Sequence, residues 1–270
     1  MIYPNWLYYP DDDLELFIDT VQQTSYVAST DHQEYIGAND GKSRIKATPN
    51  LPTATFECTW DTNHIKDIYR YLEYLRGKEV ILAFGPQDLA SYAKIVEASV
   101  PWTIGTVQKA SISVQFIGAV RGQFREAEDS RNTLVDAAST TDSDASGGVA
   151  ELVYGAGDGA YFTVEQSDIL LPKGDYIVFA RVRDNGYYAN AQAAVSDDVV
   201  LSVQNVTDST SLVSATNTIS SKKYQIFTAD FTIDKDDIGD EISIKVTKGS
   251  QSVISIAGLL YDFLGFVAKP

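Results

Sequence analysis

One segment of the first half has the spacing of an amphipathic helix. Apolar side chains recur there every three or four residues, at Ile65, Ile68, Tyr69, Leu72 and Leu75, which places them on one helical face. Asp61 or Thr62 can accept hydrogen bonds from the free amides at its start, and Gly77 can adopt the left-handed conformation that ends a helix. The pattern therefore predicts one helix between Asp61 and Gly77.

Around this helix, short alternating or apolar runs predict strands, at residues 54–60, 80–84, 91–98 and 110–117. In the first of them Phe56, Cys58 and Trp60 fall on one face. The only cysteine of the chain is therefore interpreted as a packed core thiol rather than a reactive one. Residues 1–124 are predicted to form a small sheet or sandwich with one helix packed on it.

The composition changes after residue 124. Ser, Thr, Asp and Ala dominate up to Gly148, so residues 125–148 are predicted to be a linker. Beyond it, short strand-like segments recur between turns, at 161–164, 174–182, 198–203, 224–233, 241–247 and 253–260. Such spacing without a helical period is typical of an antiparallel jelly-roll β-sandwich, here residues 149–270. The predicted fold class is mainly β.

The charge of the chain argues against one class of partner. The formal net charge is −16 and the pI about 4.4, and residues 126–270 hold 22 acidic residues against 10 basic ones. A surface this acidic repels the phosphate backbone, so no nucleic-acid binding is expected. The N-terminus lacks the pattern of a signal peptide and no apolar run reaches membrane-spanning length, so neither an export signal nor membrane insertion is expected.

Residues for catalysis or metal binding are sparse. The two histidines, His32 and His64, show no metal-ligand spacing and adjoin no nucleophile motif. The segment 37–43 is one residue short of a phosphate-binding loop and is interpreted as a hairpin turn, and the glycines of 155–159 as a flexible turn. We therefore predict no catalytic site, no metal site and no cofactor, and the chain is not expected to be an enzyme.

Two acidic residues in the predicted linker, Asp142 and Asp144, have part of the pattern of a calcium loop. The spaced ligands and the final glutamate of such a loop are missing, so a solvated linker is the default interpretation. The sequon at Asn205 carries no weight, because short patterns of this kind occur by chance.

The segment 183–190 has the composition of a sugar-binding loop. Tyrosine rings can stack on the C–H faces of sugars while amides and carboxylates bind the hydroxyl groups. The candidate glycan-binding residues are Asp184, Asn185, Tyr187 and Tyr188. The alternative is that one tyrosine anchors the loop in the core.

The order of elements in the first half resembles a known viral fold. Strand 56–60, the helix, strand 80–84, a strand containing Tyr92 and the closing strand 112–116 are similar to the tail-tube fold of distal and minor tail proteins of long-tailed phages. In that family a β-sandwich flanked by one helix assembles into a ring, usually a hexamer, that joins the tail tube to the hub. The resemblance covers residues 1–124.

The second half resembles carbohydrate-binding modules of the galactose-binding-like jelly roll. The segment 170–176, the strand 177–182 and the strand 253–261 carry the resemblance. Such families often hold a structural calcium on an acidic residue of the last strand, where this chain has Ala257 and Gly258. Glu126 and Glu128 match the opening acids of the family, but the departure in the last strand leaves a structural calcium unsupported.

Together the resemblances imply a structural protein of a viral tail. Its N-terminal domain would form a homo-oligomeric ring, expected to be hexameric, between tail tube and tail hub proteins in the virion. Its C-terminal domain would face outwards to contact a host-surface glycan or to stabilise its neighbours. The alternatives are a surface or secreted carbohydrate-binding protein outside a virus and, with less support, a glycan-degrading enzyme.

Overall fold

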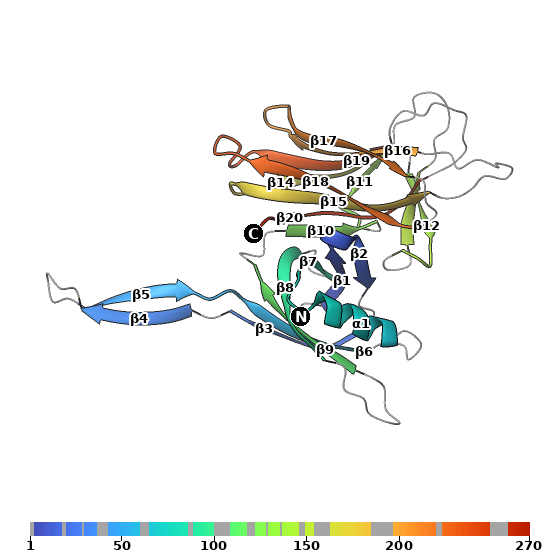
Figure 1. Ribbon diagram of the computed structural model, residues 1–270. Coiled ribbons are helices and arrows are strands. Elements are labelled where there is room, and N and C mark those ends of the chain that lie inside the picture. The colour runs from blue at the N-terminus through green and yellow to red at the C-terminus, as the bar shows by residue number, and fades with distance from the viewer. Residues whose placement is uncertain are drawn as a thin grey trace. The chain divides into compact units, whose positions relative to one another are not determined.

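The computed structural model describes residues 3–17, 20–28, 30–36, 43–59, 65–85, 89–99, 109–117, 122–127, 129–135, 137–145, 149–153, 163–184, 197–219, 223–248 and 259–270. Within them the chain is mainly β, as the sequence predicts, with one α-helix and one short 3-10 turn (Figure 1). The chain folds as two compact units, unit 1 comprising Met1–Arg121 with Pro270, and unit 2 comprising Gly122–Lys269.

The main sheet of unit 1 is antiparallel and has the strand order β2-β1-β7-β8-β9-β6-β3. The strands are β1 (Tyr3–Tyr9), β2 (Leu14–Phe17), β3 (Thr20–Val27), β6 (Thr53–Thr59), β7 (Glu79–Gly85), β8 (Leu89–Ser99) and β9 (Lys109–Phe116). Its core takes side chains from strands near both edges, including Leu7, Phe56 and Ile112. Cys58 lies in β6, two residues after buried Phe56, and its side chain is outside the described part.

The helix prediction is confirmed. Helix α1 runs from Ile65 to Leu75, and its Leu72 and Leu75 are fully buried in the core of unit 1. After it Gly77 adopts a φ of 81°, and its amide donates to the carbonyl of Ile95 in β8. Only glycine takes this left-handed conformation at little cost. The chain therefore leaves the helix directly into β7.

Two strands of unit 1 stand apart from this sheet. β4 (Thr30–Ile36) and β5 (Ser43–Pro49) pair with each other in register from Thr30↔Pro49 to Ile36↔Ser43. They form a two-stranded sheet that continues outwards from the β3–β6 pair (Figure 1). The antiparallel flanks agree with the hairpin interpretation of 37–43, although residues 37–42 lie outside the described part. Below, β4 and β5 together are called the hairpin.

Unit 2 is a sandwich of two antiparallel sheets. The first has the order β12-β13-β20-β15-β18, and β10 pairs with β20 beside β13. The second has the order β11-β14-β19-β16-β17. The strands are β10 (Gly122–Glu126), β11 (Thr133–Val135), β12 (Ala137–Thr141), β13 (Val149–Val153), β14 (Thr163–Leu170), β15 (Gly174–Asp184), β16 (Asp197–Asn205), β17 (Thr210–Ile219), β18 (Gln225–Ile233), β19 (Glu241–Lys248) and β20 (Leu259–Ala268).

The core of unit 2 lies between these sheets. Tyr176, Val178 and Val182 of β15 face inwards from the first sheet, and Leu201 and Ile244 from the second, all fully buried. Alternate residues of each strand fill the core, as a two-layer sandwich requires. The antiparallel β-sandwich that the sequence predicts for the second half of the chain is thus confirmed.

The segment 125–148 is not the linker that its composition predicts. It contributes β11 to one sheet, where Leu134 pairs with Val164, and β12 to the other, where Ala138 pairs with Leu152. Small polar residues suit strands with one solvent-exposed face as well as they suit linkers. Composition alone therefore could not distinguish a linker from strands with one exposed face.

Candidate functional site

The strands of unit 2 bring several chain connections to one end of the sandwich. β15 ends at Asp184, in register with Leu259, the first residue of β20, which also pairs with Val153 at the end of β13. In the other sheet β16 begins at Asp197, opposite the end of β17. The connections 154–162, 185–196 and 249–258 all join strand ends at this end, which we call the loop end. The opposite end, where β16–β17 and β18–β19 are joined, is called the turn end.

The predicted glycan-binding residues belong to the loop end by their place in the chain. Asp184 is the last residue of β15, although its side chain is not described. Asn185, Tyr187 and Tyr188 lie outside the described residues. Their role as sugar contacts stays a prediction.

Two polar side chains point into the sandwich at the loop end. Asn217 lies two residues before Ile219, a core residue of β17, and Gln225 lies two residues before Phe227 of β18, which packs against the core. Alternate residues share a face, so both point inwards. Within the described part, Asn217 Nδ2 and Gln225 Oε1 are buried without a hydrogen-bond partner.

Sequence reasoning missed these two residues. β17, with the sequence TSLVSATNTI, was not predicted as a strand, so the inward position of Asn217 could not be assigned. The signal for Gln225 was present, because it continues the alternation of Phe227, Ala229 and Phe231 in a segment that was predicted as a strand.

A network of charged groups lies on the outer face of the first sheet. Asp142 accepts hydrogen bonds from Arg183 Nε and Nη2, at 3.0 and 2.6 Å, and from the Tyr224 hydroxyl at 2.6 Å. It also accepts one from the amide of Asp144, at 3.1 Å. Burial raises the pKa of the Asp142 carboxyl, but the hydrogen bonds outweigh burial and hold the pKa below its usual range. Asp142 is thus a buried structural carboxylate rather than a solvated linker residue.

A second ion pair of this network is more deeply buried. Arg181 Nη1 lies 2.5 Å from Asp262 Oδ2, with both side chains almost fully buried, and also donates to the carbonyl of Asp144 at 3.0 Å. The guanidinium carbon lies 4.0 Å from the centroid of the Tyr224 ring. Burial, and next the hydrogen bond to Asp142, raise the pKa of the Tyr224 hydroxyl, so it stays protonated. The network holds the β12–β13 turn against the sheet.

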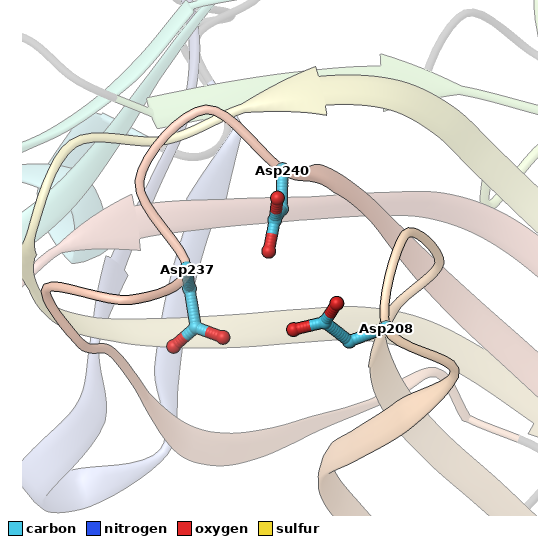
Figure 2. A group of neighbouring side chains, drawn as sticks. All are labelled: Asp208, Asp237 and Asp240. Carbon is cyan, nitrogen blue, oxygen red and sulfur yellow. The ribbon is translucent and has the colours of Figure 1, made fainter.

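The turn end gathers three carboxylates (Figure 2). Asp208 in the β16–β17 turn and Asp237 and Asp240 in the β18–β19 turn offer oxygen atoms within 4.8 Å of one another. Fully buried Asn205 organises them, because its Nδ2 donates to Asp237 at 2.9 Å and to Asp240 at 2.8 Å. Its Oδ1 accepts from the amide of Asp208 at 3.1 Å.

Carboxylate oxygens are ligands that hard cations such as Ca²⁺ prefer. Asp208, Asp237 and Asp240 are therefore the described residues whose chemistry suits a divalent cation. They differ from Asp142 and Asp144, which the sequence pointed to, and from Glu126 and Glu128, which the family resemblance pointed to. The carboxylate of Asp142 already accepts hydrogen bonds from Arg183 and Tyr224.

Nothing in the described part assembles a catalytic group around a histidine. His32 lies in β4, where its side chain is not described, and His64 lies outside the described residues. Among the described residues no helix is long and apolar enough to cross a membrane.

Its strand pairing makes unit 2 an antiparallel β-sandwich with a polar loop end. Comparison with known proteins does not assign the chain to a family, because no family model and no curated protein matches it. The tail-tube resemblance of residues 1–124 therefore gains no support from these comparisons.

Solved structures give partial likenesses. A family 35 carbohydrate-binding module from Clostridium thermocellum is 19% identical, with 54% of this chain and 98% of that chain covered and a TM-score of 0.38. The C-terminal family 6 module of LamC, a laminarinase from Zobellia galactanivorans, is 14% identical, with 55% and 99% covered and a TM-score of 0.36. The enzymatically active domain of bacteriophage CBA120 tailspike protein 4 is 8% identical, with 55% and 19% covered and a TM-score of 0.35. Likenesses at this level carry no argument about function.

Proposed function

We propose that unit 2 binds carbohydrate at its loop end, as a binding module rather than as an enzyme. The observation that carries the proposal is the pair of inward-facing, buried and unpartnered amide atoms, Asn217 Nδ2 and Gln225 Oε1. A buried polar atom without a partner costs about 1–3 kcal/mol. In a folded protein, buried polar atoms of this kind usually form their missing hydrogen bonds with a water molecule or a ligand.

The chemistry of the two atoms suits a polyol. An amide Nδ2 donates a hydrogen bond and an amide Oε1 accepts one, and a sugar hydroxyl can both accept and donate. Neither atom carries a charge, so the pair favours a neutral sugar over an ionic ligand. The connection 185–196 begins and ends at the loop end, and its Tyr187 and Tyr188 can supply the flat surface on which sugar rings stack.

The test is a glycan array probed with the labelled full-length chain. Tyr187→Ala with Tyr188→Ala, and separately Asn217→Leu with Gln225→Met, should each weaken binding about tenfold or more, equivalent to about 1.4 kcal/mol. The second pair should not lower the melting temperature, because it removes unpartnered polar atoms from the core. Lost binding in a protein that is at least as stable separates ligand contact from unfolding.

The matched control is Thr216→Val with Thr228→Val, which changes exposed positions of the same two strands. It should leave binding unchanged. An array without binding, or binding that both variant pairs leave intact, would overturn the proposal.

A second candidate function is the predicted structural role in a viral tail, with unit 1 forming a ring between tube and hub proteins in the virion. One observation favours self-association of unit 1: the hairpin pairs with no other described strand. A two-stranded hairpin alone is marginally stable in water, so it gains from a partner. The two candidate functions are compatible, because they concern different units.

Sedimentation velocity across a concentration series tests this role, followed by negative-stain imaging of any oligomer. Closed rings are the expected result, with six subunits as the symmetry that the resemblance implies. A chain that stays monomeric alone and with tail-tube and hub proteins would contradict it.

A further inference from the structure

The hairpin projects from unit 1 without a third strand. β3 and β6 are still paired at Val27↔Thr53, and β9 pairs with β6 up to the same residue, but beyond it β4 and β5 pair only with each other among the described strands. Seven residues per strand give the hairpin a length of about 23 Å. It reaches far enough to contact a neighbouring molecule.

Basic residues recur along β5. Arg44 and Lys46 stand at alternate positions of the strand, which places them on one face of the hairpin. Their register partners on β4 are Tyr35 and Gln33. The same face also holds Asp31, opposite Thr48, so its two basic residues outnumber its one acidic residue, in a chain with a net charge of −16.

Unit 1 also carries a surface of opposite character, at the turn after β1. Three exposed carboxylates follow one another there, and a tyrosine hydroxyl donates to each: Tyr9 to Asp11 at 2.9 Å, Tyr8 to Asp13 at 3.1 Å, and Tyr74 of α1 to Asp12. These hydrogen bonds fix the carboxylates in place. None of the three has an ion-pair partner in the part of the chain that the structure describes.

Aromatic rings adjoin these carboxylates. Tyr71 and Tyr74 lie one turn apart on α1, with 43% and 49% of their surface exposed. The Lys78 ammonium lies 5.6 Å from the centroids of both the Tyr9 and Tyr74 rings, so this surface already attracts a cation within the chain. We call Asp11, Asp12, Asp13, Tyr71 and Tyr74 the acidic–aromatic patch.

We propose that the hairpin of one copy docks on the acidic–aromatic patch of a second copy, with Arg44 and Lys46 meeting the carboxylates and the tyrosine rings. The proposal rests on the second candidate function, self-association of unit 1, and names the surfaces that carry it. A guanidinium suits this patch because it pairs with carboxylates and stacks on aromatic rings.

The contact is heterologous, since two different surfaces of the chain meet. Each copy offers one hairpin and one patch, so copies add head to tail and either close into a ring or extend into a filament. Charge pairs at exposed positions are screened by salt. Association should therefore weaken as the salt concentration rises.

Charge exchange between two variants tests the pairing. The patch variant carries Asp11→Lys with Asp12→Lys, and the hairpin variant carries Arg44→Glu with Lys46→Glu, each in the full-length chain. Each alone should associate at least tenfold more weakly than the unchanged protein, because like charges then face each other. An equimolar mixture should recover association, because every hairpin can again meet a patch of opposite charge. Light scattering after size exclusion reads the mass.

Two further variants keep the test independent of folding. Asp11→Asn with Asp12→Asn retains oxygen acceptors for the Tyr9 and Tyr74 hydroxyls and should weaken association less than charge reversal does. Asp234→Lys with Asp236→Lys makes the same change in charge at exposed positions of unit 2 and should leave association unchanged.

The possible failures are distinguishable. If the unchanged chain associates and neither the reversals nor the mixture alters the mass, this docking is wrong while self-association stands. If the unchanged chain is monomeric at every concentration, the docking between copies is overturned, and the ring role then depends on other tail proteins. Carbohydrate binding by unit 2 is unaffected by either result.

Discussion

Asp142 shows how a single residue can differ from the character of its segment. It stands in a stretch rich in Ser, Asp and Ala, yet its carboxylate is 5% exposed and accepts hydrogen bonds from Arg183, Tyr224 and the Asp144 amide. Its partners Arg183 and Tyr224 lie 41 and 82 residues away in the chain. No local pattern could reveal contacts of that separation.

The first prediction concerns the pH dependence that Asp142 confers. Asp142→Asn should lower the free energy of unfolding by about 1–3 kcal/mol at pH 7, because it weakens hydrogen bonds to a charged group. The pKa of Asp142 in the folded protein lies below its ordinary value of 3.8. Its stabilisation is therefore present above pH 3.8 and is lost as the pH falls through the folded pKa. Urea unfolding at several pH values measures the difference.

Asp144→Asn is the matched control, since the Asp144 side chain is 71% exposed and its nearest cation is 4.0 Å away. It should change stability by less than about 1 kcal/mol. A difference between Asp142→Asn and the unchanged protein that stays constant from pH 7 to the acid range would contradict the assigned role of the charge.

At the scale of elements, β20 is the central strand of the first sheet of unit 2. One of its edges pairs with β15 over nearly its whole length, and the other pairs with β13 and then with β10. Nine of its ten residues are buried. A change that displaces this strand therefore disturbs three neighbours at once.

The second prediction is that Gly265→Ala destabilises unit 2. A Cβ at this position would lie 2.4 Å from the carbonyl oxygen of Gln123 in β10 and 2.6 Å from the Phe179 ring. The backbone of a paired strand cannot yield as a flexible side chain does, so we expect a loss of about 1–3 kcal/mol or more in unfolding free energy. Thermal unfolding of the full-length protein measures it.

Gly239→Ala provides a contrast. No atom lies within 4 Å of its added Cβ, and its cost comes only from a φ of 94°. It should shift the unfolding free energy by about 1 kcal/mol. An equal or smaller effect at Gly265 would show that β10 and β20 separate easily there.

Element prediction from the sequence succeeded where periodicity was strong. The helix was placed within four residues of α1 at its start, and eight predicted strands match β6, β7, β8, β9, β15, β16, β18 and β19. β17 was missed because its polar, mostly exposed residues mask the alternation. The predicted strand 253–260 overlaps β20 only at Leu259 and Leu260, since apolar runs do not mark their own boundaries.

The candidate site was less predictable than the fold. Composition pointed to the segment 183–190, and the topology assigns the connection 185–196, which holds most of it, to the loop end. The inward positions of Asn217 and Gln225 depend on how two sheets face each other, and the gathering of Asp208, Asp237 and Asp240 depends on two turns that are distant in sequence. Neither follows from one strand or one turn alone.

At the scale of the whole molecule, the boundary between the two units lies near residue 122 rather than after a linker. The third prediction is that a fragment of residues 122–270 folds, whereas a fragment of residues 149–270 does not reach the same stability. The shorter fragment lacks β10, β11 and β12, so it leaves edges of β20, β14 and β13 unpaired. Circular dichroism and thermal unfolding of both fragments measure this.

Equal melting temperatures of the two fragments would contradict this division and return residues 125–148 to the role of a linker. A fragment of residues 122–270 that fails to fold alone would instead show that unit 2 depends on unit 1.

The burial of Asn205 has a consequence for producing this protein in eukaryotic cells. Asn205-Val206-Thr207 is an acceptor sequence for N-linked glycans. In the folded chain both amide hydrogens of Asn205 are engaged, by Asp237 and Asp240. A glycan could therefore be attached only before β16 and β19 come together, and the modified chain could no longer close this end. Passage through the endoplasmic reticulum would set sugar transfer in competition with folding, and Asn205→Ser would remove that competition at the cost of the two hydrogen bonds.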